Sequence, residues 1–359
     1  MPTSNPQLTR AEAFCAAYGL RVPILLAPMA GACPASLSIA VANAGGLGSC
    51  GALLMQPAAI KAWAAEVRAG SNGGFNLNLW IPDPPPMRDA AAEDAVRSFL
   101  GGWGPEVPRQ AGDVSPPDFA AQCEALLEVG PTIISSIMGV YPAAFVERMK
   151  AQGIKWFANA TTVAEAKAAE AAGADVIVAQ GMEAGGHRGA FDAAKAPTEL
   201  VGLFALLPAI VDAVKVPVVA TGGIADARGI AAALMLGASA VQIGTGFLRC
   251  PEAKLAPAWA DAIGRTLPEQ TLLTRAFSGR PGRAVATAYA RAAAASDAPN
   301  PAPYPVQRGL TQAMRDAAAK TNDIDRMQAW SGQSARLAMA KPAADVVHEL
   351  WSGAQALLR

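Results

Sequence analysis

One segment of the chain concentrates residue types that can act on a ligand. Residues 180–189 read QGMEAGGHRG, with four glycines and one histidine in ten positions. Glycine lets a backbone approach a ligand closely, and histidine is the side chain whose ordinary pKa suits proton transfer near neutral pH. A lone histidine is more often structural than catalytic. His187 lies in the cluster that follows the apolar run 175–179, whereas the other histidine, His348, lies in the C-terminal segment, so the position of His187 favours catalysis.

Two later apolar runs also end in glycine-rich clusters. The run 217–220 continues into TGGI (221–224), and the run 240–243 continues into GTG (244–246). Backbone N–H groups that no side chain shields can converge on one anion, which a nearby helix N-terminus also favours. Glycines often serve only a turn, but two consecutive clusters of this type favour a phosphate site.

The first apolar run ends in APMAG (27–31), a cluster of small residues. Such a cluster is compatible with a plain turn from a strand into a helix. It would also leave room for a flat ring to lie against the backbone. Both interpretations remain open at this point.

These clusters need a scaffold that brings the ends of several strands together. Short apolar runs alternate with Ala- and Leu-rich stretches, a pattern typical of a parallel sheet covered by helices. Two of the stretches, 164–175 and 225–240, carry Gly173 and Gly237 near the ends of their expected helices. Eight is the number of parallel strands that closes a TIM barrel, in which reactive groups lie at the carboxyl ends. The expected strands are 22–28, 47–51, 74–79, 132–137, 155–158, 175–179, 217–220 and 240–243.

We therefore predict an α/β fold, a (β/α)8 TIM barrel with a smaller, mainly helical C-terminal domain. At 359 residues the chain exceeds the roughly 250 residues typical of such a barrel. Residues 1–264 should form the barrel, with 81–117 as a loop insertion on the side of the active site or a surface excursion. Residues 265–335 should form the small substrate-side domain, and 336–359 a terminal helix that packs back on the barrel as its eighth.

Composition excludes several other classes of protein. The formal net charge is zero and no basic run occurs, which argues against a nucleic-acid partner. No apolar stretch is long enough for a membrane span, and the N-terminus lacks the pattern of a secretion signal. The five cysteines are widely spaced and only two histidines could join them, so we expect reduced core thiols, no metal site and a cytoplasmic protein. The oligomeric state is left open.

The motifs also resemble a known family. AQGMEAGGHRG (179–189), with APMAG, FNLNLW (75–80), TGGI, QIGTGFL (242–248), TRAFSGRPGR (274–283) and WSGQSA (330–335), is similar to the nitronate monooxygenases, formerly called 2-nitropropane dioxygenases. The resemblance runs over nearly the whole chain. It implies an FMN-dependent TIM barrel with a smaller domain over the flavin, which oxidises alkyl nitronates, and possibly nitroalkanes, with O2 to a carbonyl compound and nitrite.

Carried over motif by motif, the resemblance implies a role for each site residue. His187 would be the catalytic base. The residues expected to bind the cofactor are Ala27, Pro28 and Met29 along the isoalloxazine ring, Asn78, Gln180 and Gly185 beside it, and Gly222, Gly223, Gln242, Gly244 and Thr245 at the phosphate.

The chain departs from the family pattern at a few positions. Gly246 replaces a bulkier or basic residue, TIISSIMG (132–139) lacks the usual histidine and phenylalanine, and GRPGRAVATAYA (279–290) matches the tail motif only in part. These departures concern the substrate pocket more than the flavin. Two alternatives remain, an FMN-dependent NAD(P)H reductase of the enoyl-acyl-carrier or quinone type, and a flavin-binding protein without turnover.

Overall fold

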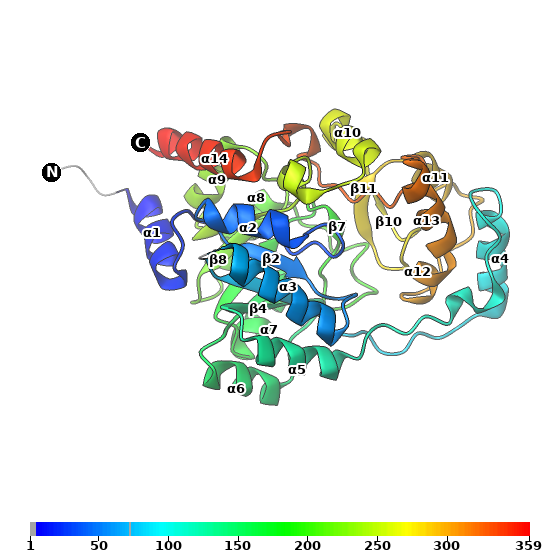
Figure 1. Ribbon diagram of the computed structural model, residues 1–359, viewed down its shortest axis with the longest axis horizontal. Coiled ribbons are helices and arrows are strands. Elements are labelled where there is room, and N and C mark those ends of the chain that lie inside the picture. Colours follow the sequence, from blue (N-terminus) through cyan, green and yellow to red (C-terminus); the bar gives the residue numbers. More distant parts are fainter. Residues whose placement is uncertain (1–4, 72) are drawn as a thin grey trace.

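The computed structural model describes residues 5–71 and 73–359. The first four residues of the N-terminal segment, for which the sequence predicts no secretion signal, lie outside the described residues. The ribbon shows a larger part and a smaller part along the long axis of the molecule (Figure 1). The larger part is a barrel. The smaller part, which we call the cap, is built from residues 81–117 and 265–335.

The barrel is a sheet of eight parallel strands. Its hydrogen-bonded order is β1-β9-β8-β6-β5-β4-β3-β2, and a bridge between Leu25 and Leu47 joins the first strand to the second. The sheet therefore closes, and the predicted (β/α)8 TIM barrel is confirmed. All eight expected strands are present: β1 Ile24–Leu26, β2 Gly48–Gly51, β3 Phe75–Trp80, β4 Ile133–Ile137, β5 Lys155–Ala160, β6 Val176–Gln180, β8 Val218–Thr221 and β9 Ala240–Ile243.

Successive side chains along each strand point alternately into the barrel and outward to the helices, so they belong to two different apolar layers. Val176 and Val178 of β6 point into the barrel interior, where they pack with Phe157. Ile177, between them, packs outward in the large core shared with the surrounding helices. Strands that are buried on both faces in this way read as continuous apolar runs, which is why the sequence revealed them.

A ring of helices covers the outside of the barrel. Gly173 and Gly237 follow α7 and α9 with φ of +99° and +106°, the left-handed conformation that stops a helix. The helices of the ring are α2 Ala35–Asn43, α3 Pro57–Gly70, α5 Phe119–Val129, α6 Ala143–Ala151, α7 Val163–Ala171, α8 Leu203–Val211, α9 Ala227–Met235 and α14 Ala343–Leu358.

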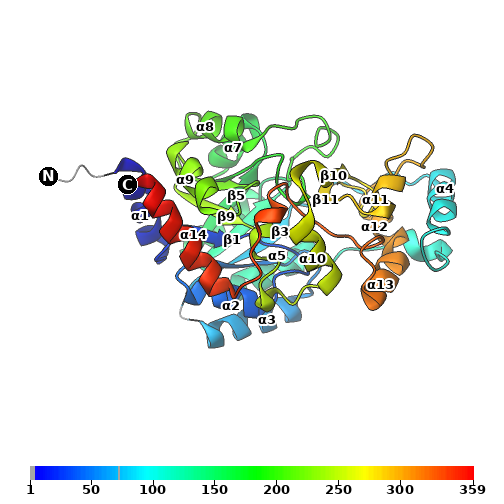
Figure 2. The same cartoon turned by 90° about the horizontal axis from the view of Figure 1, so that it is seen from above.

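The two ends of the described chain lie side by side (Figure 2). The C-terminal helix α14 packs between α9 and α2, so it occupies the eighth position of the ring after the chain has passed through the cap. Helix α1 (Pro6–Tyr18) places Phe14 against the apolar barrel interior. None of the described helices is long and apolar enough to cross a membrane.

The cap differs in two ways from what the sequence suggested. Residues 81–117 are not simply a loop, because they contain α4 (Ala90–Leu100) and η1 (Arg109–Gly112). The buried face of α4, with Val96 and Leu100, joins a second hydrophobic core whose other members, apart from Val107, lie beyond residue 270. A partner so distant in sequence cannot be seen in the segment itself. The domain boundaries stay a prediction.

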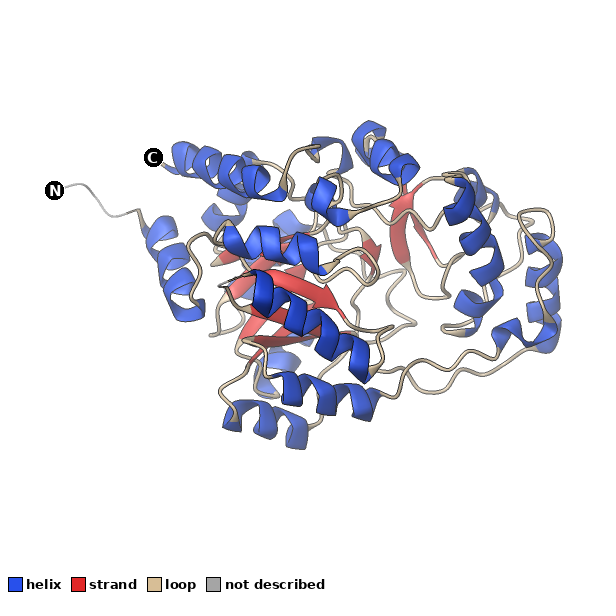
Figure 3. Ribbon diagram, in the orientation of Figure 1, coloured by secondary structure: helices blue, strands red, loops and turns tan. Residues whose placement is uncertain are grey.

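The sequence suggested a mainly helical domain, but the centre of the cap is a three-stranded sheet (Figure 3). Strands β10 (Thr271–Thr274) and β11 (Gly282–Val285) are antiparallel, and β7 (Gly186–His187) from the loop after β6 is the third strand. The other cap elements are η4 Pro268–Gln270, α11 Ala288–Ala292, α12 Val306–Leu310, α13 Gln312–Thr321 and η5 Ala335–Leu337, and the segment between β9 and the cap forms η2 Thr245–Phe247, η3 Pro251–Ala253 and α10 Pro257–Arg265.

Candidate active site

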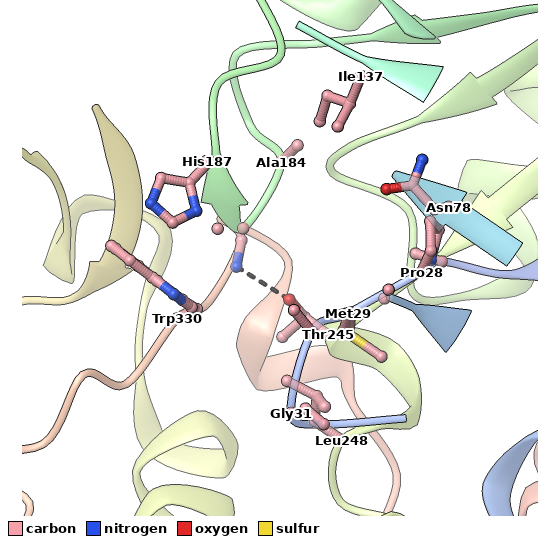
Figure 4. Close-up of a pocket in the computed structure, with 18 of the residues that line it drawn as sticks. Pro28, Met29, Gly31, Asn78, Ile137, Ala184, His187, Thr245, Leu248 and Trp330 are labelled. Carbon is pink, nitrogen blue, oxygen red and sulfur yellow. Dashed lines mark hydrogen bonds between the residues drawn. The ribbon is translucent and has the colours of Figure 1, made fainter. Parts of the chain in front are cut away.

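A cavity of about 530 Å³ lies between the carboxyl ends of the barrel strands and the cap. Its volume falls in the range of roughly 300–1,000 Å³ that small-molecule and cofactor sites occupy. Every site residue expected from the sequence lines it: Ala27, Pro28, Met29, Asn78, Gln180, Gly185, His187, Gly222, Gly223, Gln242, Gly244 and Thr245. Figure 4 shows Pro28, Met29 and Asn78 on one side and His187 with Trp330 on the other. The structure thus brings these residues together, while their roles stay predictions.

Polar side chains from the middle strands face this cavity. The Nδ2 group of Asn78 on β3 donates a hydrogen bond of 2.9 Å to Ser135 Oγ on β4. On β5, the buried Nδ2 of Asn159 has no acceptor among the described residues. A buried donor without a partner costs free energy, so a ligand that accepts a hydrogen bond at this position fits the site.

The glycine-rich ends of β8 and β9 offer further donors. The backbone N–H groups of Gly222, Gly223, Gly244 and Thr245 have no acceptor within residues 5–71 and 73–359. Unpaired amides at two neighbouring strand ends are the arrangement that binds phosphate in TIM barrels. The cavity therefore fits a ligand with a terminal phosphate at this end.

The glycines at these ends are not there for a ligand alone. Gly222 has a φ of +106°, and a Cβ there would lie 3.1 Å from the backbone nitrogen of Ala184. A Cβ on Gly185 would lie 2.5 Å from the nitrogen of Gly332. The protein itself therefore requires both positions to be glycine, because the loop after β6 packs against its neighbours without side chains.

Gln180, at the end of β6, shapes the loop that carries the histidine. Its Nε2 donates to the carbonyl of His187 at 3.2 Å, and its Oε1 accepts from the N–H of Gly189 at 2.8 Å. Both ends of the amide are thus used to fold the loop back over the strand. One N–H of the amide is left for the cofactor contact expected from the sequence.

The imidazole of His187 is packed between two indoles. Its ring centroid lies 4.7 Å from that of Trp80 and 4.8 Å from that of Trp330, both in edge-to-face geometry. Its Nε2 is 2.7 Å from the hydroxyl of Ser278 in the cap. The glycines beside His187 in the chain offer it nothing to pack on, so its packing neighbours come from β3 and from the cap.

His187 is also electrostatically unusual. Burial, together with the positive charges of Arg280 and Arg308, lowers its pKa to about 3. Arg280 itself is paired, since its Nη1 donates to both carboxylate oxygens of Asp83 at 2.9 and 2.8 Å. At neutral pH the imidazole is therefore uncharged, and it acts as a weak base and a hydrogen-bonding group.

Several residues of the site were not singled out from the sequence. Five of them are Trp80, Ser278, Tyr304, Arg308 and Trp330. Three lie inside the motifs FNLNLW, TRAFSGRPGR and WSGQSA, so a motif signal existed but did not say which side chain faces the ligand. Tyr304 and Arg308 lie outside these motifs and gave no such signal.

The atypical positions lie at the edges of the site. Ile137 at the end of β4 lines the cavity (Figure 4), and the next residue, Met138, is buried with a φ of 69°. At Gly246 a Cβ would lie 2.7 Å from Cγ2 of Ile243, so a larger residue there would require local rearrangement. Within the described residues, all five cysteines are free and buried, and no group of three or more His, Cys, Asp or Glu could hold a metal.

Comparison with known proteins gives consistent matches over the chain. Residues 13–353 match the family model described as nitronate monooxygenase. A nitronate monooxygenase of Paraburkholderia phytofirmans is 38% identical over 348 residues, which are 95% of this chain and 94% of that protein. The solved structure of nitroalkane oxidase from Streptomyces ansochromogenes has a TM-score of 0.86 and 34% identity, covering 97% of this chain and 100% of that one. FabK from Thermotoga maritima has a TM-score of 0.75 and 26% identity, covering 96% of each chain.

Proposed function

Because the chain belongs to the nitronate monooxygenase family, we propose that it is an FMN-dependent enzyme that oxidises alkyl nitronates with O2 to a carbonyl compound and nitrite. Two nitronates and one O2 give two carbonyl compounds and two nitrite ions, one oxygen atom of O2 going to each carbon as its bond to nitrogen breaks, so atoms and charge balance. The observation that carries the proposal is a cavity that both the unpaired strand-end amides and a neutral His187 line.

The cofactor is proposed from the donors that line the cavity. The amides of Gly222, Gly223, Gly244 and Thr245 would hold the phosphate of FMN. The loop 27–29 would lie along the ring system, with the side chains of the middle strands as hydrogen-bond partners. FMN, when bound, supplies the redox chemistry, because it can take electrons from the substrate carbon and pass them to O2. A dinucleotide is less suitable, since no Gly-x-Gly-x-x-Gly fingerprint follows a strand.

The state of His187 favours an anionic substrate. A nitronate is already deprotonated at carbon, so a group with a pKa of about 3 need not remove a proton from it. The neutral imidazole can orient the nitronate by a hydrogen bond, and Ser278 holds the ring through Nε2. A neutral nitroalkane would need a stronger base, so we propose that His187 serves such substrates less well.

The alternative reductase would share the cofactor but not the electron donor. We would purify the yellow protein, identify the flavin released on heating, and follow its anaerobic spectrum after adding NADH or ethyl nitronate. Bleaching by the nitronate, together with O2 uptake and nitrite release in air, supports the monooxygenase. Release of FAD would contradict the proposed cofactor, and steady NADH consumption under argon with a quinone or enone would favour the reductase instead.

A further inference from the structure

The cap contributes an arginine to the cavity that no part of the proposed function uses. Arg308 lies on α12, partly buried, and lines the same cavity as His187. Among the described residues, its guanidinium has no hydrogen bond and no ion pair. Only its backbone carbonyl is used, as an acceptor for Thr311 and Arg315. A partly buried cation that lines a cavity and has no partner there is a strong candidate for binding a ligand of opposite charge.

Arg308 lies close to the proposed reacting end of the cavity. Its charge is one of the causes that lower the pKa of His187. A chain of ring contacts joins the same region, since the ring of Tyr304 lies 5.3 Å from that of Trp80, and Trp80 packs on His187. Tyr304 and Arg308 interact electrostatically across the cavity wall. The imidazole and the guanidinium therefore face one ligand volume.

The neighbouring charges leave the subsite positive. Arg315 on α13 donates through Nη2 to the carbonyl of Arg308 at 2.8 Å, and so helps to hold α12 in place. Asp316 is the acid that interacts with both arginines, but it is exposed and accepts a hydrogen bond from Gln312 at 2.7 Å. Burial lowers the pKa of Arg308, yet a guanidinium remains charged at neutral pH. Two cations against one screened acid favour an anion.

We propose that Arg308 is the residue that selects the anionic nitronate, by binding its negatively charged oxygens opposite His187, and that Arg315 positions it. This inference rests on the proposed function for the identity of the substrate. It assigns the discrimination between a nitronate and its neutral nitroalkane to one cation of the cap. Because the cation is partly buried, its attraction is screened less by salt than that of a surface charge.

The test uses a planar anion that cannot be oxidised, so that binding is separated from turnover. Nitrate binding to the flavin-loaded protein is measured by calorimetry for the wild type, Arg308→Met and Arg308→Lys. Arg291→Met is the matched control, because Arg291 is an exposed arginine of α11 in the same cap and does not line the cavity. Flavin content and melting temperature show whether each variant is folded.

We expect Arg308→Met to weaken nitrate binding roughly 10- to 100-fold, the usual effect of losing a hydrogen bond to a charged group. Arg308→Lys should recover part of that loss, and Arg291→Met should bind like the wild type. The KM for ethyl nitronate should rise in parallel with the nitrate Kd, while the KM for neutral nitroethane should change little.

The outcomes separate this inference from the proposed function. A nitrate Kd and a nitronate KM within twofold of the wild type in Arg308→Met would overturn the role of Arg308, as would a wild type that binds no nitrate. Nitrate binding that depends on Arg308 in a protein without nitronate turnover would support the anion site and count against the proposed function.

Discussion

His187 lies directly opposite Gly282 in antiparallel register, so the imidazole is held by the sheet of the cap as well as by the barrel. A Cβ on Gly282 would lie 2.8 Å from the ring of Trp330, the same ring that packs on His187. The position of the imidazole therefore depends on how the cap is attached to the barrel.

The Asp83–Arg280 ion pair should stabilise the attachment of the cap. The side chain of Arg280 is 2% exposed and that of Asp83 is 23% exposed. Asp83→Asn leaves a buried guanidinium without its countercharge, and we expect the free energy of unfolding to fall by about 3 kcal/mol. Urea unfolding of the flavin-loaded protein measures this loss.

The exposed pair Arg148–Glu124 provides the control for that experiment. Both side chains are 52% exposed, and surface pairs contribute little to stability. Glu124→Gln should therefore leave the unfolding midpoint nearly unchanged. Equal effects of the two substitutions would show that the buried Asp83–Arg280 pair contributes no more to the free energy of unfolding than the exposed pair.

Gly244 and Gly222 should respond differently to a larger side chain. Gly244 has a φ of −105°, which any residue adopts, and its Cβ would lie 3.3 Å from Ala27 Cβ at the cavity edge. We expect Gly244→Val to lower the flavin content of the purified protein without a large change in the melting temperature of the apoprotein. Gly222→Val should lower both, because the left-handed backbone adds a strain of about 1–2 kcal/mol.

The ratio of flavin to protein absorbance and the melting temperature of the apoprotein are the two readouts. A Gly244→Val protein with full flavin content would count against the proposed phosphate end of the cavity. A Gly222→Val protein whose apo form melts like the wild type would show that the packing of Ala184 against this glycine can relax.

The barrel could be predicted from the sequence because its signals are local. Each strand is a short apolar run that ends in glycine or a polar residue, so the expected and observed strands nearly coincide, as with 240–243 and β9. The strand ends of a closed parallel barrel must meet at one face, so the cofactor residues were expected together. Their common cavity follows from the fold.

The surroundings of His187 could not be predicted in this way. Ser278, which bonds its ring, is 91 positions away in the chain, and Trp330 is farther still. The helix α4 was missed for the same reason, because its buried residues Val96 and Leu100 face a core formed mostly after residue 270. Contacts of this range depend on how the cap closes over the barrel, and no local pattern encodes them.

The lowered pKa of His187 should be visible in the acid stability of the protein. In the unfolded chain a histidine titrates near its ordinary pKa of about 6.5, whereas in the folded protein it titrates at about 3. Between these values the unfolded state binds one proton more, so stability rises with pH there and is lost as the pH falls from about 6.5 toward 3. His187→Gln should remove this contribution and flatten the dependence by at most about 1.4 kcal/mol per pH unit.

Urea unfolding between pH 4 and pH 7 measures that slope in both proteins. His348→Gln is the control, because this histidine lies on the exposed face of α14. Parallel curves for the wild type and His187→Gln would mean that His187 titrates normally in the folded protein.

Two substitutions should separate a positioning role of His187 from a role as a base. His187→Asn removes the basic nitrogen, and Ser278→Ala removes only the hydroxyl that lies 2.7 Å from Nε2. A general base typically contributes about 10²–10⁴-fold in rate, and because the pKa of His187 is about 3 we expect His187→Asn to lose only about 10²-fold, the lower end of that range, on nitroethane. On ethyl nitronate, which has no proton to remove, the loss of activity in His187→Asn should be smaller.

Ser278→Ala should lower both activities by a similar, modest factor, because the ring of His187 stays in place between Trp80 and Trp330 but loses its hydrogen bond. Steady-state rates on both substrates, corrected for flavin content, provide the comparison. Near-wild-type rates of His187→Asn on both would show that the imidazole takes no part in the chemistry, and a colourless or insoluble variant would assign it to packing.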